Sequence, residues 1–273
     1  MSMQRTYIIN GGVDLGISPF DRGLSYGDGV FRTFKVVGGL PIDWPLHYQR
    51  LVNDCGAIGI VCPSAEVLMS DIQNLFLPND NAVAKIIITR GEGERGYAAP
   101  AVTMPTRIVI KAEMPALIDT YYKQGIQLFV CKTTLSYQAS LAGVKHLNRL
   151  ENVLARAEWN DPTYLDGLMF DSEGNVIECT SANIFARYGK ELHTPLIDRC
   201  GIAGVTRQRI INLAHQSMLK PIVKNIQLPE LLEADEVIIC NSIYGALQVR
   251  AIADKKWEMG GLATKIREIL VPL

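Results

Sequence analysis

The hydrophobic and polar positions of the chain predict strands and helices that alternate along its whole length. Short apolar or alternating runs bounded by glycine, proline and aspartate are typical of strands, whereas apolar residues three and four apart are typical of amphipathic helices. We expect strands at residues 6–10, 30–37, 84–90, 106–112, 125–131, 166–171, 176–186, 191–194, 221–226 and 236–240. We expect helices at residues 46–57, 207–218 and 262–270, one capped by Ser64, and one around Leu150. The mixture predicts an α/β protein with strands and helices in both halves.

The pattern breaks once, near the middle of the chain. The run Glu113-Met-Pro-Ala-Leu-Ile-Asp119 matches neither a strand nor a helix period. We therefore predict an N-terminal α/β subdomain at residues 1–112, a linker at 113–120 and a C-terminal α/β subdomain at 121–273. A chain of 273 residues is long enough for two domains of ordinary size.

Composition and charge are those of a globular protein. Hydrophobic residues make up 48% of the chain, and the formal net charge of -1 gives no reason to expect a nucleic acid or a membrane as partner. The six cysteines form no Cys-x-x-Cys pair, so the sequence predicts neither a metal site nor a disulfide framework. We expect a cytoplasmic protein, because the N-terminus shows no signal peptide and no apolar run is long enough to span a bilayer.

Lys145 is the first candidate for chemistry. It follows small and apolar residues in Leu141-Ala-Gly-Val-Lys-His-Leu-Asn-Arg-Leu-Glu151. Leu147, Leu150 and Leu154 share one face of a helical pattern, which predicts that the lysine lies where an extended segment turns into a helix. An amine that is shielded from water loses its proton more readily, and a neutral amine is a nucleophile. A solvated lysine before a helix fits the same local pattern.

Three more polar features occur in the second half. Glu178 shares a strand face with Val176 and Thr180, where a carboxylate needs a partner, although an exposed edge-strand glutamate fits equally well. Gly201-Ile-Ala-Gly-Val-Thr206 precedes a helix, and the first N–H groups of a helix bind phosphate. Cys240-Asn-Ser242 directly follows a strand, a position at which hydroxyls and amides often line sites. An ordinary loop and a plain turn are the alternatives for the last two.

Together these features are the parts that an enzyme dependent on pyridoxal 5'-phosphate requires. That cofactor needs a lysine for a Schiff base and an acid that keeps its pyridine nitrogen protonated. It also needs a helix N-terminus, hydroxyls and an arginine for its phosphate. We therefore expect pyridoxal 5'-phosphate as the cofactor.

Six segments resemble the fold-type IV family of pyridoxal-phosphate enzymes, in family order and across nearly the whole chain. This family includes branched-chain aminotransferases, D-amino-acid aminotransferases and 4-amino-4-deoxychorismate lyase. The segments are Tyr26-Gly-Asp-Gly-Val-Phe31, His47-Tyr-Gln-Arg-Leu51, Lys145-His-Leu-Asn-Arg-Leu-Glu151, Glu178-Cys-Thr-Ser-Ala-Asn-Ile-Phe185, Gly201-Ile-Ala-Gly-Val-Thr-Arg207 and Ala234-Asp-Glu-Val237. The resemblance implies a two-subdomain fold similar to D-amino-acid aminotransferase, a cofactor in the cleft between the subdomains, and a homodimer.

Within the family, the sequence looks most like the aminodeoxychorismate lyases. The matching runs are Gly143-Val-Lys-His-Leu-Asn-Arg-Leu-Glu151, Arg90-Gly-Glu-Gly-Glu-Arg-Gly-Tyr97, Asp171-Ser-Glu-Gly-Asn-Val-Ile-Glu178 and Ile239-Cys-Asn241. The resemblance implies conversion of 4-amino-4-deoxychorismate to 4-aminobenzoate and pyruvate, a step of folate biosynthesis. The alternatives are an aminotransferase acting on D- or branched-chain amino acids and a catalytically silent cofactor-binding protein.

The resemblance also implies a role for each matching residue. Lys145 would form the Schiff base and act as general base, and either the Lys145 ammonium or the Thr33 hydroxyl would donate a proton. The other residues implied for the cofactor are Arg50, Glu178, Val205, Thr206, Asn241 and Ser242. Those implied for the substrate are Tyr26, Phe31, Arg95 and Tyr97, together with residues of a second subunit.

Overall fold

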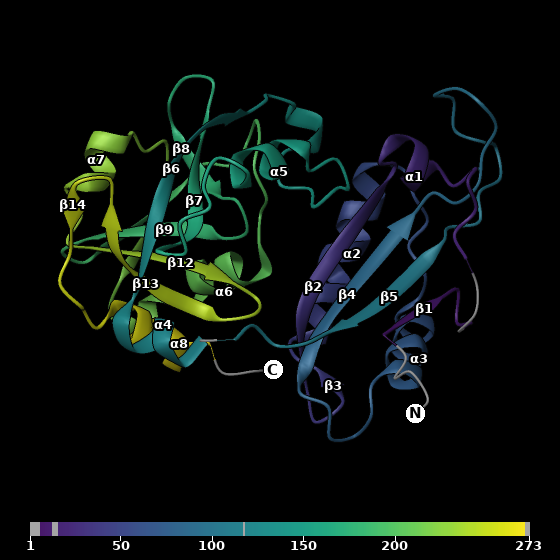
Figure 1. Ribbon diagram of the computed structural model, residues 1–273, viewed down its shortest axis with the longest axis horizontal. Coiled ribbons are helices and arrows are strands. Elements are labelled where there is room, and N and C mark those ends of the chain that lie inside the picture. The colour runs from purple at the N-terminus through teal and green to yellow at the C-terminus, as the bar shows by residue number, and fades with distance from the viewer. Residues whose placement is uncertain (1–5, 13–15, 117, 271–273) are drawn as a thin grey trace. The chain divides into compact units, whose positions relative to one another are not determined.

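The computed structural model describes residues 6–12, 16–116 and 118–270, which form two compact units (Figure 1). The first unit contains the described residues up to Met114 together with Val144–Asn148, and the second contains the other described residues. The boundary after Met114 falls within residues 113–120, the stretch where the sequence predicts the linker. Lys145, which the sequence placed in the second half, groups with the first unit, because its carbonyl accepts a hydrogen bond from the Phe31 N–H at 2.9 Å.

The first unit is built on an antiparallel sheet with the strand order β1-β5-β4-β2-β3. The register of β2 against β4 places Thr33 opposite Lys85. Helices α2 and α3 pack on one face of this sheet. The elements are β1 (Tyr7–Ile9), α1 (Arg22–Tyr26), β2 (Gly29–Val37), β3 (Leu40–Pro41), α2 (Trp44–Ala57), α3 (Ala65–Leu75), β4 (Ala82–Thr89) and β5 (Arg107–Ala112).

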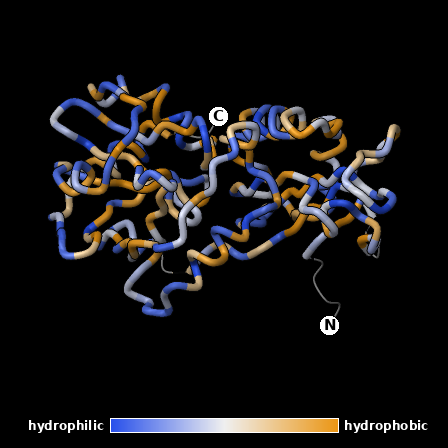
Figure 2. Tube along the Cα trace, turned by 90° about the horizontal axis from the view of Figure 1, so that it is seen from above, coloured by the Kyte–Doolittle hydropathy of each residue, from blue (hydrophilic) through white to orange (hydrophobic). Residues whose placement is uncertain are grey.

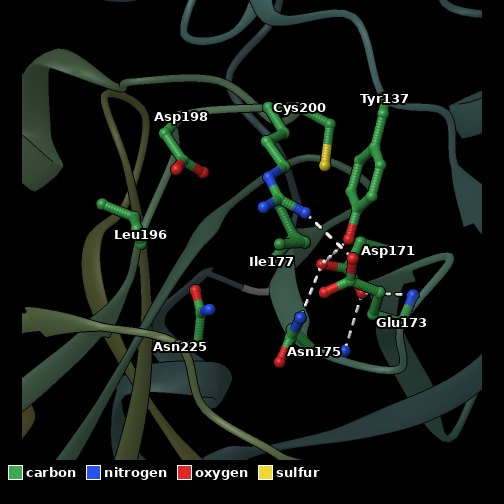
Figure 3. Close-up of a pocket in the computed structure, with 10 residues that line it drawn as sticks. Tyr137, Asp171, Glu173, Asn175, Ile177, Leu196, Asp198, Cys200 and Asn225 are labelled. Carbon is green, nitrogen blue, oxygen red and sulfur yellow. Dashed lines mark hydrogen bonds and ion pairs between the residues drawn. The ribbon is translucent and has the colours of Figure 1, made fainter.

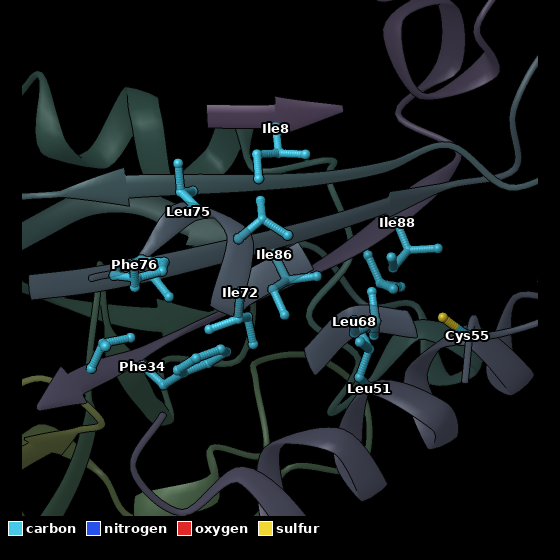
Figure 4. Packing of buried hydrophobic residues seen from close by; sticks show 14 of the residues in the cluster. Ile8, Phe34, Leu51, Cys55, Leu68, Ile72, Leu75, Phe76, Ile86 and Ile88 are labelled. Atoms are coloured by element: carbon cyan, nitrogen blue, oxygen red, sulfur yellow. The ribbon is translucent and has the colours of Figure 1, made fainter. Parts of the chain in front are cut away.

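The core of the first unit lies between the sheet and its two long helices (Figure 4). Val30, Phe34 and Val36 of β2 are buried in this core, whereas Phe31 and Thr33 are only partly buried. Because successive side chains of a strand point to opposite faces, the latter two lie on the face away from the helices. We call this the open face of the first sheet.

The second unit is built on a larger, mixed sheet with the order β11-β10-β9-β12-β13-β6-β7-β8, to which β14 adds beside β13. The pairs β10–β11, β13–β6 and β6–β7 are parallel, and the others are antiparallel. The elements are α4 (Ile118–Gln124), β6 (Ile126–Leu135), α5 (Leu150–Arg156), β7 (Tyr164–Asp171), β8 (Val176–Cys179), β9 (Asn183–Tyr188), β10 (Glu191–Pro195), α6 (Val205–Leu213), β11 (Lys220–Lys224), α7 (Leu228–Leu232), β12 (Glu236–Asn241), β13 (Gly245–Ile252), β14 (Lys255–Lys256) and α8 (Leu262–Ile269), with short 3₁₀ helices at Ala139–Leu141 and Ala214–Ser217.

Strand β12 shows why the second unit has continuous apolar runs, which appear orange along the chain in Figure 2. Val237 and Ile239 pack into one hydrophobic cluster, while Ile238 and Cys240 pack into another that includes residues of α6 and α8. Both faces of this strand are therefore covered, and a strand buried on both faces needs apolar residues at successive positions.

The mixed α/β fold predicted from the sequence is confirmed, with local differences. Residues 176–186 form two strands rather than one, because the Cys179 N–H donates to the Ala182 carbonyl at 2.7 Å and turns the chain between them. Helix α5 begins at Leu150, so Leu147 lies before the helix. The elements that were not predicted are α1, β3, α4, α7, β13 and β14. Helix α4 begins at Ile118, inside the stretch predicted to be a linker. Among the described residues, none of the helices has the length and apolar character needed to cross a membrane.

Candidate active site

The main chain around Lys145 is fixed to the first unit on both sides of the lysine. The Phe31 N–H donates to the Lys145 carbonyl, and the Leu147 N–H donates to the Gly29 carbonyl, both at 2.9 Å. The Lys145 N–H donates to Oδ2 of Asp54 at 3.2 Å. Lys145 therefore lies in an extended segment beside the first residues of β2, and the start of the helix follows five residues later.

Asp54 is held by a buried ion pair with Arg32. Burial lowers the pKa of Arg32; the carboxylate of Asp54 opposes this shift, and the like charge of Arg50 adds to it. Arg32 was not singled out from the sequence. An arginine at a core position of an alternating strand is a signal for such a pair, because a buried charge needs a partner.

The side chain of Lys145 lies over the open face of the first sheet. Its Nζ is 4.5 Å from the centroid of the Phe31 ring. Thr33 follows Phe31 on the same face of β2. The structure therefore brings three of the predicted residues together in the first unit. Arg50, on α2, belongs to the same unit.

Glu178 lies in the second unit and is almost completely buried, with 2% of its surface exposed. Its Oε2 accepts a hydrogen bond from the Ile202 N–H at 2.8 Å. Burial lowers the pKa of Arg149, and the charge of Glu178 opposes this shift. The alternative of an exposed edge glutamate is therefore wrong, and Arg149 is a neighbour that the sequence reasoning did not identify.

Glycine is required in the loop that holds Glu178. Gly201 has a φ of +85°, and a Cβ at this position would lie 2.6 Å from Cγ2 of Ile177. The Gly143 N–H donates to the Gly201 carbonyl at 2.9 Å, so the chain that leads to Lys145 starts from this loop.

The same loop forms the start of helix α6, and Asn183 fastens it. The Asn183 amide donates to the Ile202 carbonyl at 2.8 Å and accepts from the Gly204 N–H at 3.2 Å. No side chain caps the helix at Gly204. The N–H groups at a helix start have no carbonyl partner within the helix, which makes them donors for an anion. The hydroxyl of Thr206 lies 3.2 Å from that of Ser242, so two hydroxyls lie beside the N-terminal turn.

Asn241 has a structural task in this unit. Its Oδ1 accepts hydrogen bonds from the N–H groups of Ile243 and Tyr244, at 2.9 and 3.1 Å. Its Nδ2 donates to the Ser181 carbonyl at 3.3 Å. The amide thus shapes the turn that carries Ser242, while direct contact with a cofactor stays a prediction.

The predicted substrate residues Arg95 and Tyr97 lie in an exposed loop, with 89% of Tyr97 accessible to solvent. Tyr26 contacts this loop: its hydroxyl accepts from the Gly96 N–H at 3.1 Å, and its ring centroid is 5.5 Å from that of Tyr97. Their roles toward a substrate stay predictions.

Two buried arginines, which were not singled out from the sequence, hold the loop of Arg95 and Tyr97 and the residues where it begins. Arg22 donates to the carbonyls of Gly96 and Tyr97 and pairs with Asp28 at 2.9 Å. Arg90 makes two further hydrogen bonds to Asp28, at 2.7 and 3.0 Å. Asp28 lies inside the glycine-rich motif of the first unit, and its acceptor role explains why an aspartate stands among glycines there.

A small pocket of the second unit contains none of the predicted site residues (Figure 3). Three of its polar side chains bond to one another: the Tyr137 hydroxyl and the Asn175 amide both donate to Oδ2 of Asp171 at 2.8 Å. Burial raises the pKa of the neighbouring Cys200 thiol to about 12, so it stays protonated near neutral pH. These contacts order the turn between β7 and β8 and offer no reactive group.

Comparison with known proteins gives consistent matches along the chain. The family model for amino-transferase class IV matches residues 29–252. Aminodeoxychorismate lyase from Vibrio harveyi is 34% identical over 233 residues, which are 85% of this chain and 86% of that protein. The crystal structure of 4-amino-4-deoxychorismate lyase from Pseudomonas aeruginosa has a TM-score of 0.91 and 39% identity, covering 97% of each chain. A PLP-bound hypothetical aminotransferase from Mycobacterium tuberculosis has a TM-score of 0.82 over 97% of this chain and 96% of that one; at 18% identity, this shows the shared fold alone. The chain therefore belongs to the class IV aminotransferase family, as the sequence motifs predicted.

Proposed function

We propose that the protein is a lyase that uses pyridoxal 5'-phosphate to convert 4-amino-4-deoxychorismate to 4-aminobenzoate and pyruvate. The observation that carries this proposal is the similarity to the Pseudomonas lyase, at 39% identity over 97% of both chains. The two chains share the fold over that length, and the similarity to the lyase from Vibrio harveyi supports the same activity.

The residues present fit the cofactor. The second unit offers a buried carboxylate, Glu178, for a protonated pyridine nitrogen. It also offers the uncapped start of α6 with the hydroxyls of Thr206 and Ser242 for a phosphate. When bound, pyridoxal phosphate supplies an electron sink next to the amine that the enzyme processes. Arg50 would add a positive charge for the phosphate.

Lys145 would hold the cofactor and then act as the base. As a neutral amine it would remove the hydrogen from the ring carbon that bears the substrate nitrogen. The hydrogen bonds of the Lys145 N–H and carbonyl fix the start of the lysine side chain, so that only its flexible stem has to move. The ring of Phe31 provides a face over which the ammonium form is stabilised after it takes the proton.

The reaction balances without a further reagent. The ring loses one hydrogen and its enolpyruvyl ether, whose carbon–oxygen bond to the ring breaks, and the departing group receives a proton and becomes pyruvate. The Lys145 ammonium or the Thr33 hydroxyl would supply this proton. The carbocycle becomes aromatic, which makes the elimination more favourable than a return of the proton to the cofactor.

An aminotransferase of D- or branched-chain amino acids is the second candidate. The class IV family match favours it, because such enzymes share this family and fold. It differs in one requirement: the proton must return to the cofactor, and a 2-oxo acid must accept the amino group.

The two candidates are separated by product analysis of the purified protein. One sample contains pyridoxal phosphate and aminodeoxychorismate made in situ by its synthase, with pyruvate read through lactate dehydrogenase. A parallel sample contains D-alanine and 2-oxoglutarate. We expect equal amounts of pyruvate and 4-aminobenzoate in the first and little turnover in the second. Transamination without 4-aminobenzoate would replace the lyase by the aminotransferase.

We also propose a homodimer, and we keep the cytoplasmic location as a prediction. Helix α5 exposes an apolar stripe in the single chain: Leu150 is 74% exposed, and Val153 and Leu154 are each 60% exposed. An exposed apolar helix face is typical of an interaction surface. Light scattering of wild type against a Leu150→Ser/Leu154→Ser variant tests the dimer, and we expect the variant to shift toward monomer. A monomeric wild type would contradict it.

A further inference from the structure

Lys85 is a cationic residue on the open face of the first sheet. It lies in β4 opposite Thr33 of β2, and it is only partly buried, whereas its neighbours Ala84 and Ile86 are fully buried in the core on the other face. The alternation of β4 therefore directs the Lys85 side chain away from the helices and onto the face that carries Phe31 and Thr33.

Lys85 and Lys145 share one aromatic ring. Their Nζ atoms lie 4.8 Å and 4.5 Å from the centroid of Phe31. The two nitrogens are therefore separated by no more than the sum of these distances. Residues that are 60 positions apart in the sequence thus place two amines at one small area of the open face.

The other lysines of this sheet have an acidic neighbour. Lys111 forms an ion pair with Asp80. Burial lowers the pKa of Lys35, and the charge of Asp43 opposes this shift. Among the described residues, none forms an ion pair with Lys85. An ammonium group that is partly removed from water and has no acidic partner favours the binding of a carboxylate ligand beside it.

We propose that Lys85 is a substrate-binding residue that recognises the ring carboxylate of the substrate. This proposal rests on the proposed function, because it takes Lys145 as the residue that processes the substrate amine. In 4-aminobenzoate, the amine and the carboxylate stand at opposite ends of a six-membered ring. A ring that presents its nitrogen to Lys145 can extend its carboxylate across Phe31 to Lys85.

This assignment explains selectivity for a cyclic amino acid. In an α-amino acid the carboxylate is attached to the carbon that bears the amine, so it cannot reach a cation at the far end of a ring. Lys85 thus favours the binding of a substrate whose carboxylate is remote from the amine. The binding energy is available before any bond breaks, so its loss should appear in KM more than in kcat.

The test compares the binding of two ligands to wild type and to a Lys85 variant, and it needs no turnover. Calorimetry measures the binding of 4-aminobenzoate and of its neutral isostere, 4-aminobenzamide, to the cofactor-loaded protein. Wild type should prefer the carboxylate by about 10- to 100-fold, the value of a charge-assisted hydrogen bond. In Lys85→Met, which keeps the apolar stem over Phe31, this preference should disappear. The matched control is Lys35→Met, a lysine on the same face two positions from Thr33, which should keep the preference.

Each outcome decides the proposal. A wild type that binds both ligands equally overturns it without any variant, so a poorly folded Lys85→Met does not leave it open. An unchanged preference in Lys85→Met, or an equal loss for both ligands, also overturns it. In turnover, we expect Lys85→Met to raise KM for aminodeoxychorismate by about 10- to 100-fold with a smaller change in kcat. If wild type releases pyruvate and 4-aminobenzoate but shows no carboxylate preference, the lyase function stands and only the role of Lys85 fails.

Discussion

The two units hold their candidate residues by different means. In the first unit, charged side chains add to the main-chain hydrogen bonds around Lys145: Asp54, paired with Arg32, accepts from the Lys145 N–H, and Arg22 and Asp28 fasten the loop at Gly96. In the second unit, the neutral amide of Asn183 fixes the main chain of the loop that precedes α6, and the Ile202 N–H of this loop donates to Glu178. The first arrangement depends on charge, and the second depends on shape and backbone conformation. Different substitutions should therefore disturb them.

The largest effect on turnover is expected from removing the Lys145 amine, which belongs to the first unit. Lys145→Ala should lower turnover by at least about 10³-fold, because the variant lacks both the nucleophile and the general base. It should also lose the visible absorbance that the protein gains with pyridoxal phosphate. Pyruvate release and absorbance spectra measure the two effects, with the exposed Lys190→Ala as control. Pyruvate release at the wild-type rate by Lys145→Ala would contradict the role of the lysine.

A neutral replacement of Glu178 in the second unit tests whether catalysis needs the negative charge of this residue. Glu178→Gln keeps an oxygen that accepts from the Ile202 N–H, so the loop should stay in place. It cannot stabilise a protonated pyridine nitrogen, and we expect kcat to fall by about 10²-fold. Steady-state kinetics beside the exposed control Glu233→Gln measure this effect. An unchanged kcat would mean that the carboxylate serves the loop alone.

A smaller effect is expected from adding one methyl group to the loop of the second unit. A Cβ at Gly204 would lie 2.3 Å from Oδ1 of Asn183, so Gly204→Ala must displace either the start of α6 or the amide that fastens it. We expect the cofactor Kd to rise by about tenfold, the value of one weakened hydrogen bond to a charged group. Absorbance titration measures this, with Gly56→Ala as control, because nothing lies within 4 Å of a Cβ there. Equal cofactor affinity in wild type and Gly204→Ala would show that the start of α6 does not bind the cofactor phosphate.

The last effect is expected on stability and not on catalysis, and it should depend on pH in the first unit. Burial by itself raises the pKa of Asp28, but hydrogen bonds and charges of Arg90 and Arg22 outweigh it and hold the pKa below the ordinary 3.8. The stabilisation is therefore present above pH 3.8 and is lost as the pH falls below this value through the folded-state pKa.

Asp28→Asn tests this dependence. It should lower the free energy of unfolding by about 1–3 kcal/mol at pH 7, since it weakens hydrogen bonds to charged groups. The difference from wild type should shrink toward pH 3, and urea unfolding at pH 7, 5 and 3 measures it. A difference that does not depend on pH would show that shape, and not charge, holds this loop.

The sequence predicted the elements with strong periodicity and the fold class. Helix α2, helix α3 with its Ser64 cap, and strands β2, β4 and β12 lie within a few residues of their predicted positions. The apolar face expected around Leu150 exists, but it is exposed in the single chain. Periodicity shows that a helix has an apolar face and does not show what covers that face, because the covering group is distant in sequence or on another chain.

The sequence by itself determined the family and the candidate residues Lys145 and Glu178, because these stand in motifs of local spacing. The tertiary structure decided that Glu178 is buried with a hydrogen bond from the Ile202 N–H, that the Lys145 N–H donates to Asp54, and that Lys85 lies beside the ring that Lys145 contacts. These contacts depend on the register between strands and on which face a side chain occupies. A register joins residues such as Thr33 and Lys85 that are far apart along the chain, and local periodicity contains no information about that pairing.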